Sequence, residues 1–351
     1  MSPKFRGSSD DWLDDHKFSA GKSSSGRQKR AQGKTPEATA KELSLEDSNA
    51  VVSEVFPNQC RIRLNIEKTE LLCSYRRAGV ISKAKEDYRE RSPVAVGDRV
   101  LVELLNPQCG VIKGICKRTN SLSRLAPGRE GGSLLHVLAA NIDLLVIVAS
   151  ANQPEFSMGL VDRFLIASEM EKIRSLICIT KMDLFQAPQE KPWEIYQEIG
   201  YQVVEVASKA GLGLDTLKAE LEGKTVVFCG QSGVGKTSLL RILTGKEIGR
   251  VGEVNERTGK GRHTTTGAML LEGPSQSYWI DTPGVKEFGL VRIAPQSLAS
   301  LFPEFMLASC PIQGCLHQDE PECSIKDFVR YPSYKRMLES VIEEHAKRQK
   351  V

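Results

Sequence analysis

Gly230-Gln-Ser-Gly-Val-Gly-Lys-Thr237 matches the pattern G-x-x-x-x-G-K-[ST], which is typical of loops that bind nucleotide phosphates. The apolar run Thr225-Val-Val-Phe-Cys229 precedes it, and Ser238-Leu-Leu-Arg-Ile-Leu243 follows it with the spacing of a helix. A strand, a glycine-rich turn and a helix together let backbone N–H groups surround phosphate oxygens. We therefore interpret this segment as a phosphate-binding loop and not as an incidental turn before a helix.

Two side chains of the loop carry its chemistry. Lys236 can reach the β- and γ-phosphate oxygens, where it would also act in catalysis, and the Thr237 hydroxyl can bind Mg²⁺. The residues predicted to bind nucleotide here are Gly230, Gln231, Ser232, Gly233, Val234, Gly235, Lys236, Thr237 and Ser238.

A second phosphate-site element is Asp281-Thr-Pro-Gly284, which follows the apolar segment Tyr278-Trp-Ile280. The carboxylate of Asp281, at the end of such a strand, can hold Mg²⁺ or its water shell, and the Gly284 N–H can approach the γ-phosphate. Alone, a D-x-x-G sequence mostly marks a turn. After a phosphate-binding loop it indicates a nucleotide site.

Between these elements lies the polar stretch Gly259-Lys-Gly-Arg-His-Thr-Thr-Thr266, which has no apolar period. It suits a loop that orders when a hydroxyl coordinates Mg²⁺ and the γ-phosphate, although a plain surface loop is the alternative. The spacing does not decide which threonine takes that role. We favour Thr265 as the second hydroxyl ligand of Mg²⁺ and as a catalytic residue.

Base recognition is predicted for two segments that precede the phosphate-binding loop. The Asp183 carboxylate of Thr180-Lys-Met-Asp183 can accept guanine N1–H and the 2-amino group, while the stem of Lys181 covers the base. Ala207-Ser-Lys209 follows the next strand and can offer a backbone N–H to guanine O6. The predicted base-reading residues are Thr180, Lys181, Met182, Asp183, Ser208 and Lys209. A charged loop without this role is the alternative.

The 351 residues are enough for two or three domains. Apolar runs from Ile142 to Ala149, Ser175 to Thr180 and Tyr201 to Val206 alternate with expected helices at about 159–173, 192–199 and 214–221, which predicts a mostly parallel α/β sheet. About five short strands before position 120 predict a small β-barrel of the oligonucleotide-binding type. We expect a disordered arm (1–49), this barrel (50–120), the α/β domain (121–295) and a C-terminal α-helical domain (296–351).

The C-terminal part contains Cys310-x₄-Cys315-x-His317-x₅-Cys323. Three thiolates and one imidazole form the ligand set of a closed, structural zinc site. Free thiols or one disulfide are the alternatives. Beyond the cluster, Tyr334, Met337, Leu338 and Val341 are spaced as the apolar face of a helix.

Charge and composition bear on partners and location. The formal net charge is only +4, but residues 51–120 carry 13 basic and eight acidic groups, and residues 16–34 carry six basic groups and no acid. These segments are candidates for phosphate contacts, although a solvated tail is the simpler reading of 16–34. The longest apolar stretch, Leu144 to Ala149, is too short to span a bilayer. Nine unevenly spaced cysteines suit a reducing cytoplasm, so we expect a cytoplasmic protein that does not bind membranes.

The motifs have the order of a circularly permuted GTPase, because the base-reading elements precede the phosphate-binding ones. Together with the Gly-Arg-His-Thr-Thr-Thr loop, the Asp-Thr-Pro-Gly-Val turn, the barrel and the Cys/His cluster, they resemble the bacterial small-ribosomal-subunit biogenesis GTPases of the RsgA (YjeQ) type. The resemblance covers about residues 50–345. It implies an OB-fold domain, a permuted P-loop GTPase domain and a zinc domain. It also implies GTP as substrate, Mg²⁺, one structural Zn²⁺, and a partner in the maturing small subunit and its rRNA; we expect a monomer.

Two positions depart from the general GTPase pattern. Thr180 stands where the base-reading motif begins with Asn, so we expect the bridging contact of that amide to be lost and the affinity for guanine nucleotides to be lower. Val285 stands where Ras-like enzymes place a water-orienting Gln. The attacking water must therefore be ordered by another group, for which His263 and a ribosomal group are the candidates.

Two other functions remain compatible with the residues alone. In a non-catalytic RNA-binding scaffold, the nucleotide would be structural and the barrel and zinc domain would do the work. A P-loop ATPase or kinase would not need Asp183. GTP hydrolysis that rises with small subunits and falls in Lys236→Ala distinguishes the first of these from a GTPase, and a relaxed GTP preference in Asp183→Asn argues against the second.

Overall fold

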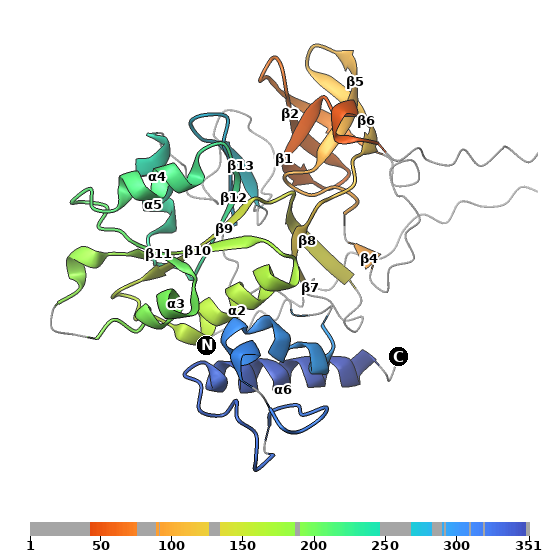
Figure 1. Ribbon diagram of the computed structural model, residues 1–351. Coiled ribbons are helices and arrows are strands. Elements are labelled where there is room, and N and C mark those ends of the chain that lie inside the picture. Colours follow the sequence, from red (N-terminus) through yellow and green to blue (C-terminus); the bar gives the residue numbers. More distant parts are fainter. Residues whose placement is uncertain are drawn as a thin grey trace, which may run out of the picture. The chain divides into compact units, whose positions relative to one another are not determined.

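The computed structural model describes residues 43–75, 89–90, 92–125, 134–186, 190–245, 268–282, 290, 293–308, 310–318 and 320–348 (Figure 1). They belong to one compact unit, Ala40–Val351. None of the helices among these residues has both the length and the apolar character needed to cross a membrane.

Five strands form a closed barrel, as the sequence predicted. They are β1 (Ala50–Phe56), β2 (Gln59–Leu64), β3 (Glu70–Ser74), β5 (Arg99–Asn106) and β6 (Cys109–Ile115), preceded by the short helix η1 (Leu45–Asp47). The pairing order is β1-β2-β3-β6-β5, with β5 returning to β1 and β3 running parallel to β6. Ile62 and Leu64 point into the barrel while Arg61 and Arg63 point outward, because side chains alternate along a strand.

The α/β part of the chain is built on a six-stranded sheet of order β11-β10-β9-β12-β14-β13. Its strands are β9 (Leu144–Ser150), β10 (Arg174–Thr180), β11 (Gln202–Glu205), β12 (Thr225–Cys229), β13 (Met269–Glu272) and β14 (Tyr278–Asp281). All pairs are parallel except β13 with β14. Every residue of β9 and β12 is buried, as their uninterrupted apolar character predicted.

Helices cover both faces of this sheet (Figure 1). They are α2 (Met158–Met170), α3 (Glu194–Ile199), α4 (Leu214–Leu221) and α5 (Lys236–Thr244). Alternate residues of β9 belong to different cores: Ile147 packs in the core that includes α2 and α3, and Val148 packs in the core that includes α4 and α5. The three helices expected from the sequence are therefore confirmed as α2, α3 and α4.

The barrel and the α/β sheet are hydrogen-bonded into one sheet of 11 strands. The junction is an antiparallel contact between β1 and β13, with Glu54 opposite Met269. β1 is buried on two sides, because Val52 faces the barrel core and Val51 faces the core of the α/β part. A separate three-stranded sheet contains β4 (Arg89–Glu90), β8 (Leu134–Ala140) and β7 (Ser121–Leu125).

The described helices of the C-terminal part are three short 3-10 helices and the long helix α6, with the Cys/His segment between them. Their bounds are η3 (Pro295–Ser297), η4 (Ala299–Leu301), η5 (Pro303–Leu307) and α6 (Tyr331–Arg348). α6 packs against α2, and the four apolar residues predicted from helical spacing are all buried: Tyr334, Met337, Leu338 and Val341. Their common face therefore joins the C-terminal part to the α/β core.

A buried cluster of charges also joins these two parts. Arg330 Nε lies 2.7 Å from Asp162 Oδ1 in α2, and its Nη1 lies 3.0 Å from Glu304 Oε2 in η5. Arg330 and Asp162 side chains are fully buried, and the guanidinium lies 4.8 Å from the centre of the Phe302 ring. Burial raises the pKa of Glu304 above its ordinary value, and the charge of Arg330 offsets part of that rise.

We predict that Arg330→Met lowers the free energy of unfolding by about 3–5 kcal/mol at pH 7, because two buried carboxylates lose their counter-charge. The loss should be smaller at pH 5. Without Arg330, Glu304 binds a proton more tightly in the folded than in the unfolded chain, so the stability of the variant falls as the pH rises. Urea unfolding at both pH values measures this.

Arg174→Met is the matched control, because Arg174 forms an ion pair with Glu220 while its own side chain is 51% exposed. Exposed pairs of this kind contribute less than about 1 kcal/mol. An Arg330→Met variant as stable as this control, or equally destabilised at both pH values, would contradict the prediction.

Candidate nucleotide-binding site and metal cluster

Four of the predicted nucleotide elements lie, in their described residues, at one edge of the α/β sheet. The phosphate-binding loop follows β12, the first base-reading element follows β10, the second follows β11, and Asp281 ends β14. These strands are parallel, so their carboxyl ends lie on the same side, where ligands bind in open α/β sheets.

The backbone of the phosphate-binding loop has positive φ at three glycines, Gly230, Gly233 and Gly235. At Gly230, φ is 148°, and an added Cβ would lie 2.2 Å from the carbonyl oxygen of Val148 in β9. Gly235 has φ 94° and is the N-cap residue of α5. The loop therefore leaves β12 in contact with β9 and leads directly into the N-terminus of α5, so the predicted strand, loop and helix are all present.

Lys236 and Asp281 are buried at this edge. Burial raises the pKa of Asp281 above its ordinary value, and the charge of Lys236 opposes that rise. Asp281 Oδ1 has no hydrogen-bond partner among the described residues. A buried carboxylate oxygen of this kind suits a divalent cation, so the residues fit the expected Mg²⁺. The neighbouring Thr282 hydroxyl instead donates to Phe228 O at 2.7 Å and ties β14 to β12.

Thr180 corrects one expectation from the sequence. Its buried hydroxyl lies 2.5 Å from the carbonyl oxygen of Val234 in the phosphate-binding loop and 3.1 Å from that of Ala149. The prediction that threonine at this position loses the bridging contact was therefore wrong. A hydroxyl reaches the loop because β10 and β12 both pair with β9 and bring their ends close together.

Lys181 makes a second link between base-reading and phosphate-binding elements. Its ammonium group donates to Gly233 O at 2.7 Å and to Gln153 O. The backbone at Lys181 is left-handed, with φ 58°, and leads into the short helix η2 (Met182–Leu184). This link places the base-reading segment directly beside the loop that is expected to hold the phosphates.

The two base-reading elements are adjacent. The Met182 N–H donates to Val206 O at 3.2 Å, and Ala207-Ser-Lys209 follows at once along the chain. The Asp183 side chain is exposed, and Ser208 is half-buried. The structure thus places the segment that begins at Thr180 beside the strand end that leads into Ser208 and Lys209.

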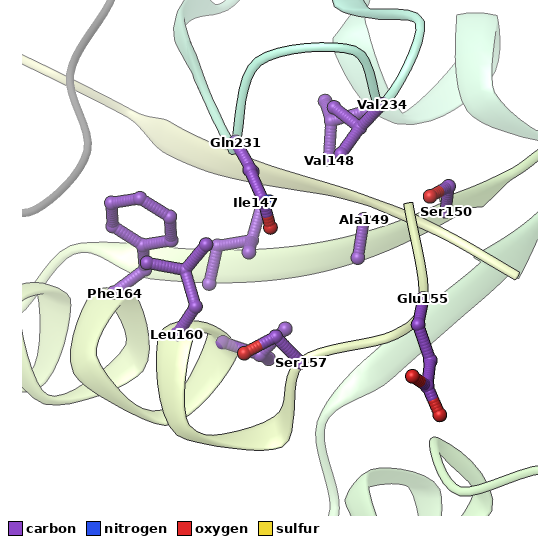
Figure 2. A pocket seen from close by; sticks show the side chains of 11 residues that line it. Ile147, Val148, Ala149, Ser150, Glu155, Ser157, Leu160, Phe164, Gln231 and Val234 are labelled. Atoms are coloured by element: carbon purple, nitrogen blue, oxygen red, sulfur yellow. The ribbon is translucent and has the colours of Figure 1, made fainter. Parts of the chain in front are cut away.

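A small pocket lies beside the phosphate-binding loop (Figure 2). β9 contributes Ile147 and Ala149 to its walls, and the start of α2 contributes Leu160 and Phe164. Gln231 projects from the loop into this pocket (Figure 2). The first turns of α2 and the loop that is predicted to bind phosphate therefore line the same pocket.

Sequence motifs did not reveal the segment 150–157, which runs from the last residue of β9 to the start of α2. It lines the pocket with Ser150, Glu155 and Ser157, and its Gln153 carbonyl accepts a hydrogen bond from Lys181. The segment follows β9, a buried strand that lies between β10 and β12, and both of these strands lead into predicted motifs. This position at the carboxyl end of the sheet was the signal that could have revealed it. His263, Thr265, Gly284 and Val285 lie outside the described residues.

The predicted metal ligands come together in the C-terminal part. The ligand atoms of Cys310, Cys315, His317 and Cys323 all lie within 4.8 Å of one another. His317 Nδ1 lies 3.2 Å from Cys323 Sγ. Burial lowers the pKa of His317, which favours the neutral imidazole that binds metals. Three sulfurs and one ring nitrogen fit a tetrahedral zinc ion.

Tyrosines of α6 support the backbone of this cluster. The Tyr331 hydroxyl lies 2.9 Å from His317 O and 2.6 Å from Gln318 O, and the Tyr334 hydroxyl donates to Leu316 O at 2.7 Å. The cluster is therefore anchored on the helix that packs against α2.

Comparison with known proteins identifies the family. The model of the RsgA GTPase family matches residues 115–291. The small ribosomal subunit biogenesis GTPase RsgA 1 of Vibrio vulnificus is 38% identical over 271 residues, 72% of this chain and 76% of the relative. That of Shewanella oneidensis, named RsgA, is 38% identical over 282 residues, 74% of this chain and 78% of the relative. The chain belongs to the RsgA GTPase family.

Solved structures agree with this assignment. The crystal structure of YjeQ from Thermotoga maritima matches with a TM-score of 0.63 and 28% identity, over 84% of this chain and 98% of that one. YloQ, described as a circularly permuted GTPase, matches with a TM-score of 0.57 and 28% identity, over 84% and 94%. This chain has the same permuted order. The base-reading elements follow β10 and β11, which precede β12 and its phosphate-binding loop along the sequence, and in the sheet β9 separates β10 from β12.

We predict that Thr180→Val weakens GDP binding about tenfold, because the isosteric side chain leaves buried carbonyls without a donor, at about 1–3 kcal/mol. Thr180→Ser keeps the hydroxyl and should bind GDP nearly as the wild type does. Titration with a fluorescent GDP analogue measures both affinities. Equal affinity of the valine and serine variants would contradict the bridging role of Thr180.

We also predict one zinc ion per chain by elemental analysis after purification without chelators. Cys310→Ser should lower this content and the melting temperature, because a structural metal contributes directly to folding. Cys109→Ser, which changes a half-buried cysteine outside the cluster, is the matched control. Full zinc content in Cys310→Ser, or equal loss in both variants, would contradict the assignment.

Proposed function

We propose that this RsgA GTPase hydrolyses GTP while bound to the small ribosomal subunit and acts during late maturation of that subunit. The observation that carries the proposal is the joined site, in which Thr180 and Lys181 of the base-reading segment contact Val234 and Gly233 of the phosphate-binding loop. The names of the Vibrio and Shewanella relatives support the small subunit as the partner.

The site residues take the following roles in this proposal. Asp183 and the segment at Ser208 bind guanine, and the loop from Gly230 to Ser238 binds the phosphates. Lys236 contacts the β- and γ-phosphates and stabilises the charge that develops there. Thr237, Thr265 and Asp281 hold Mg²⁺, which neutralises phosphate charge when it is bound.

The group that orders the attacking water is proposed to be either His263 or a ribosomal group. The apolar side chain of Val285 can neither donate nor accept a hydrogen bond, so it cannot orient a water molecule. Because the water-orienting Gln is absent, we expect turnover by the isolated protein to be slow, and a ribosomal group further predicts strong stimulation by subunits. The two candidates differ in where the missing group resides, and the variant His263→Ala distinguishes them.

The remaining parts are proposed to bind the subunit. The barrel has the strand order of oligonucleotide-binding folds, and Arg61 on its outer surface is 43% exposed. We infer that its excess of basic residues contacts rRNA phosphates, that Cys310, Cys315, His317 and Cys323 hold one structural zinc ion, and that the protein acts as a monomer in the cytoplasm.

We predict that purified small subunits raise GTP turnover by at least about tenfold, because the ribosome completes or orders the site. Raising the salt concentration from 50 to 200 mM should weaken this stimulation, since phosphate contacts are lost. Lys236→Ala should remove GTP turnover both with and without small subunits. Phosphate release, measured with and without subunits at the two salt concentrations, tests all three.

The outcomes separate the candidates. Turnover that subunits leave unchanged would contradict the proposed partner. Subunit binding that survives in Lys236→Ala, with no hydrolysis by the wild type, would favour an RNA-binding scaffold. If His263→Ala hydrolyses GTP at the wild-type rate with and without subunits, His263 has no part in ordering the water.

A further inference from the structure

β13 is a short strand whose two ends are both held by the barrel. At its first residue, Met269 lies opposite Glu54 of β1. At its last residue, Glu272 Oε2 lies 2.6 Å from Arg63 Nη2 of β2. The contact at one end is made by the backbone ladder and that at the other end by an ion pair.

The other edge of β13 faces the strand that ends at Asp281. In the antiparallel ladder between β13 and β14, Met269 lies opposite Asp281, and Glu272 lies opposite Tyr278. Met269 therefore stands between Glu54 of the barrel and Asp281 of the nucleotide site. One residue of β13 therefore links a barrel strand to the strand that ends at Asp281.

β13 has little core of its own to fix its position. Of its four residues only Leu270 is buried, whereas all five residues of β12, on the other side of β14, are buried. Segments with few buried apolar contacts have low local stability. The β13–β14 ladder therefore holds one edge of β13, and the pairing with β1 and the ion pair with Arg63 hold it on the side of the barrel.

The ion pair is well placed for this purpose. The Arg63 side chain is 14% exposed and that of Glu272 is 35% exposed, so solvent screens the pair less than an exposed one. The distance of 2.6 Å is that of a charge-assisted hydrogen bond. β2 itself is fixed in the barrel, where Ile62 and Leu64 beside Arg63 are buried.

We propose that the barrel is a structural part of the nucleotide site, and that Arg63 and Glu272 are positioning residues for Asp281. They hold β13 at its far end, β13 aligns β14, and β14 places the Asp281 carboxylate where Mg²⁺ is retained. The proposal rests on the role of Asp281 in Mg²⁺ binding given above. It also makes retention of Mg²⁺ and nucleotide depend on the barrel, the part that is proposed to contact rRNA.

The test is the dependence of nucleotide retention on free Mg²⁺ in the full-length chain, without ribosomes. A fluorescent GDP analogue is bound, and its dissociation rate is followed as free Mg²⁺ is lowered. We expect Arg63→Gln and Glu272→Gln to raise the Mg²⁺ concentration for half-maximal retention about three- to tenfold, because β14, and with it the Asp281 carboxylate, is held less firmly when the ion pair at the end of β13 is lost. Arg63→Lys, which keeps the charge, should stay within about twofold of the wild type.

Lys113→Gln is the matched control. Lys113 forms an ion pair of 2.7 Å with Glu103, between the barrel strands β6 and β5 and away from β13. It should leave the Mg²⁺ dependence unchanged. Melting temperatures of all variants are measured alongside, and Glu272→Gln carries the test if an Arg63 variant does not fold.

Asp281→Asn is the reference variant. It separates the role of Asp281 in Mg²⁺ binding from the positioning role of Arg63 and Glu272. If it leaves Mg²⁺ dependence unchanged, the role of Asp281 is wrong. If it shifts the dependence while Arg63→Gln and Glu272→Gln behave like Lys113→Gln, the positioning role is overturned. Neither result depends on small subunits, so failure of the proposed partner remains distinguishable.

Discussion

The pairing of β9 with both β10 and β12 is the constraint on which the rest of the structure depends. β9 runs parallel to each of them, with Leu144 opposite Val226 on one side and Arg174 on the other. In this permuted chain the base-reading and phosphate-binding elements lie on opposite sides of β9. Because all seven of its residues are buried, a shift in register would expose apolar side chains or displace the motifs.

Close approach of backbones turns this pairing into a site. Gly230 leaves no room for a side chain beside Val148, so the phosphate-binding loop lies against the end of β9. The next strand then delivers Thr180 to the carbonyl of Val234. Pairing, glycine geometry and one hydroxyl thus assemble the site from segments that are about 50 residues apart in sequence.

The C-terminal part is joined to this framework by a different kind of interaction. Arg330 places one charge between Asp162 of α2 and Glu304, away from solvent. Buried charges tolerate few alternative packings, because each loses solvation that only its partners replace. The first turns of α2 line the pocket beside Gln231. The C-terminal part therefore packs on the same helix that borders the nucleotide site.

The sequence by itself determined the order of the motifs, the parallel sheet, the barrel and the Cys/His ligand set, because these follow from local patterns: apolar runs such as Thr225 to Cys229, glycine spacing, and thiols within a short loop. Only the tertiary structure decided the role of Thr180, the bonds of Lys181, the buried charges at Arg330, and the junction of Arg63 with Glu272. Each of these joins residues that are distant in sequence. Their geometry depends on strand register and burial, which no local pattern specifies.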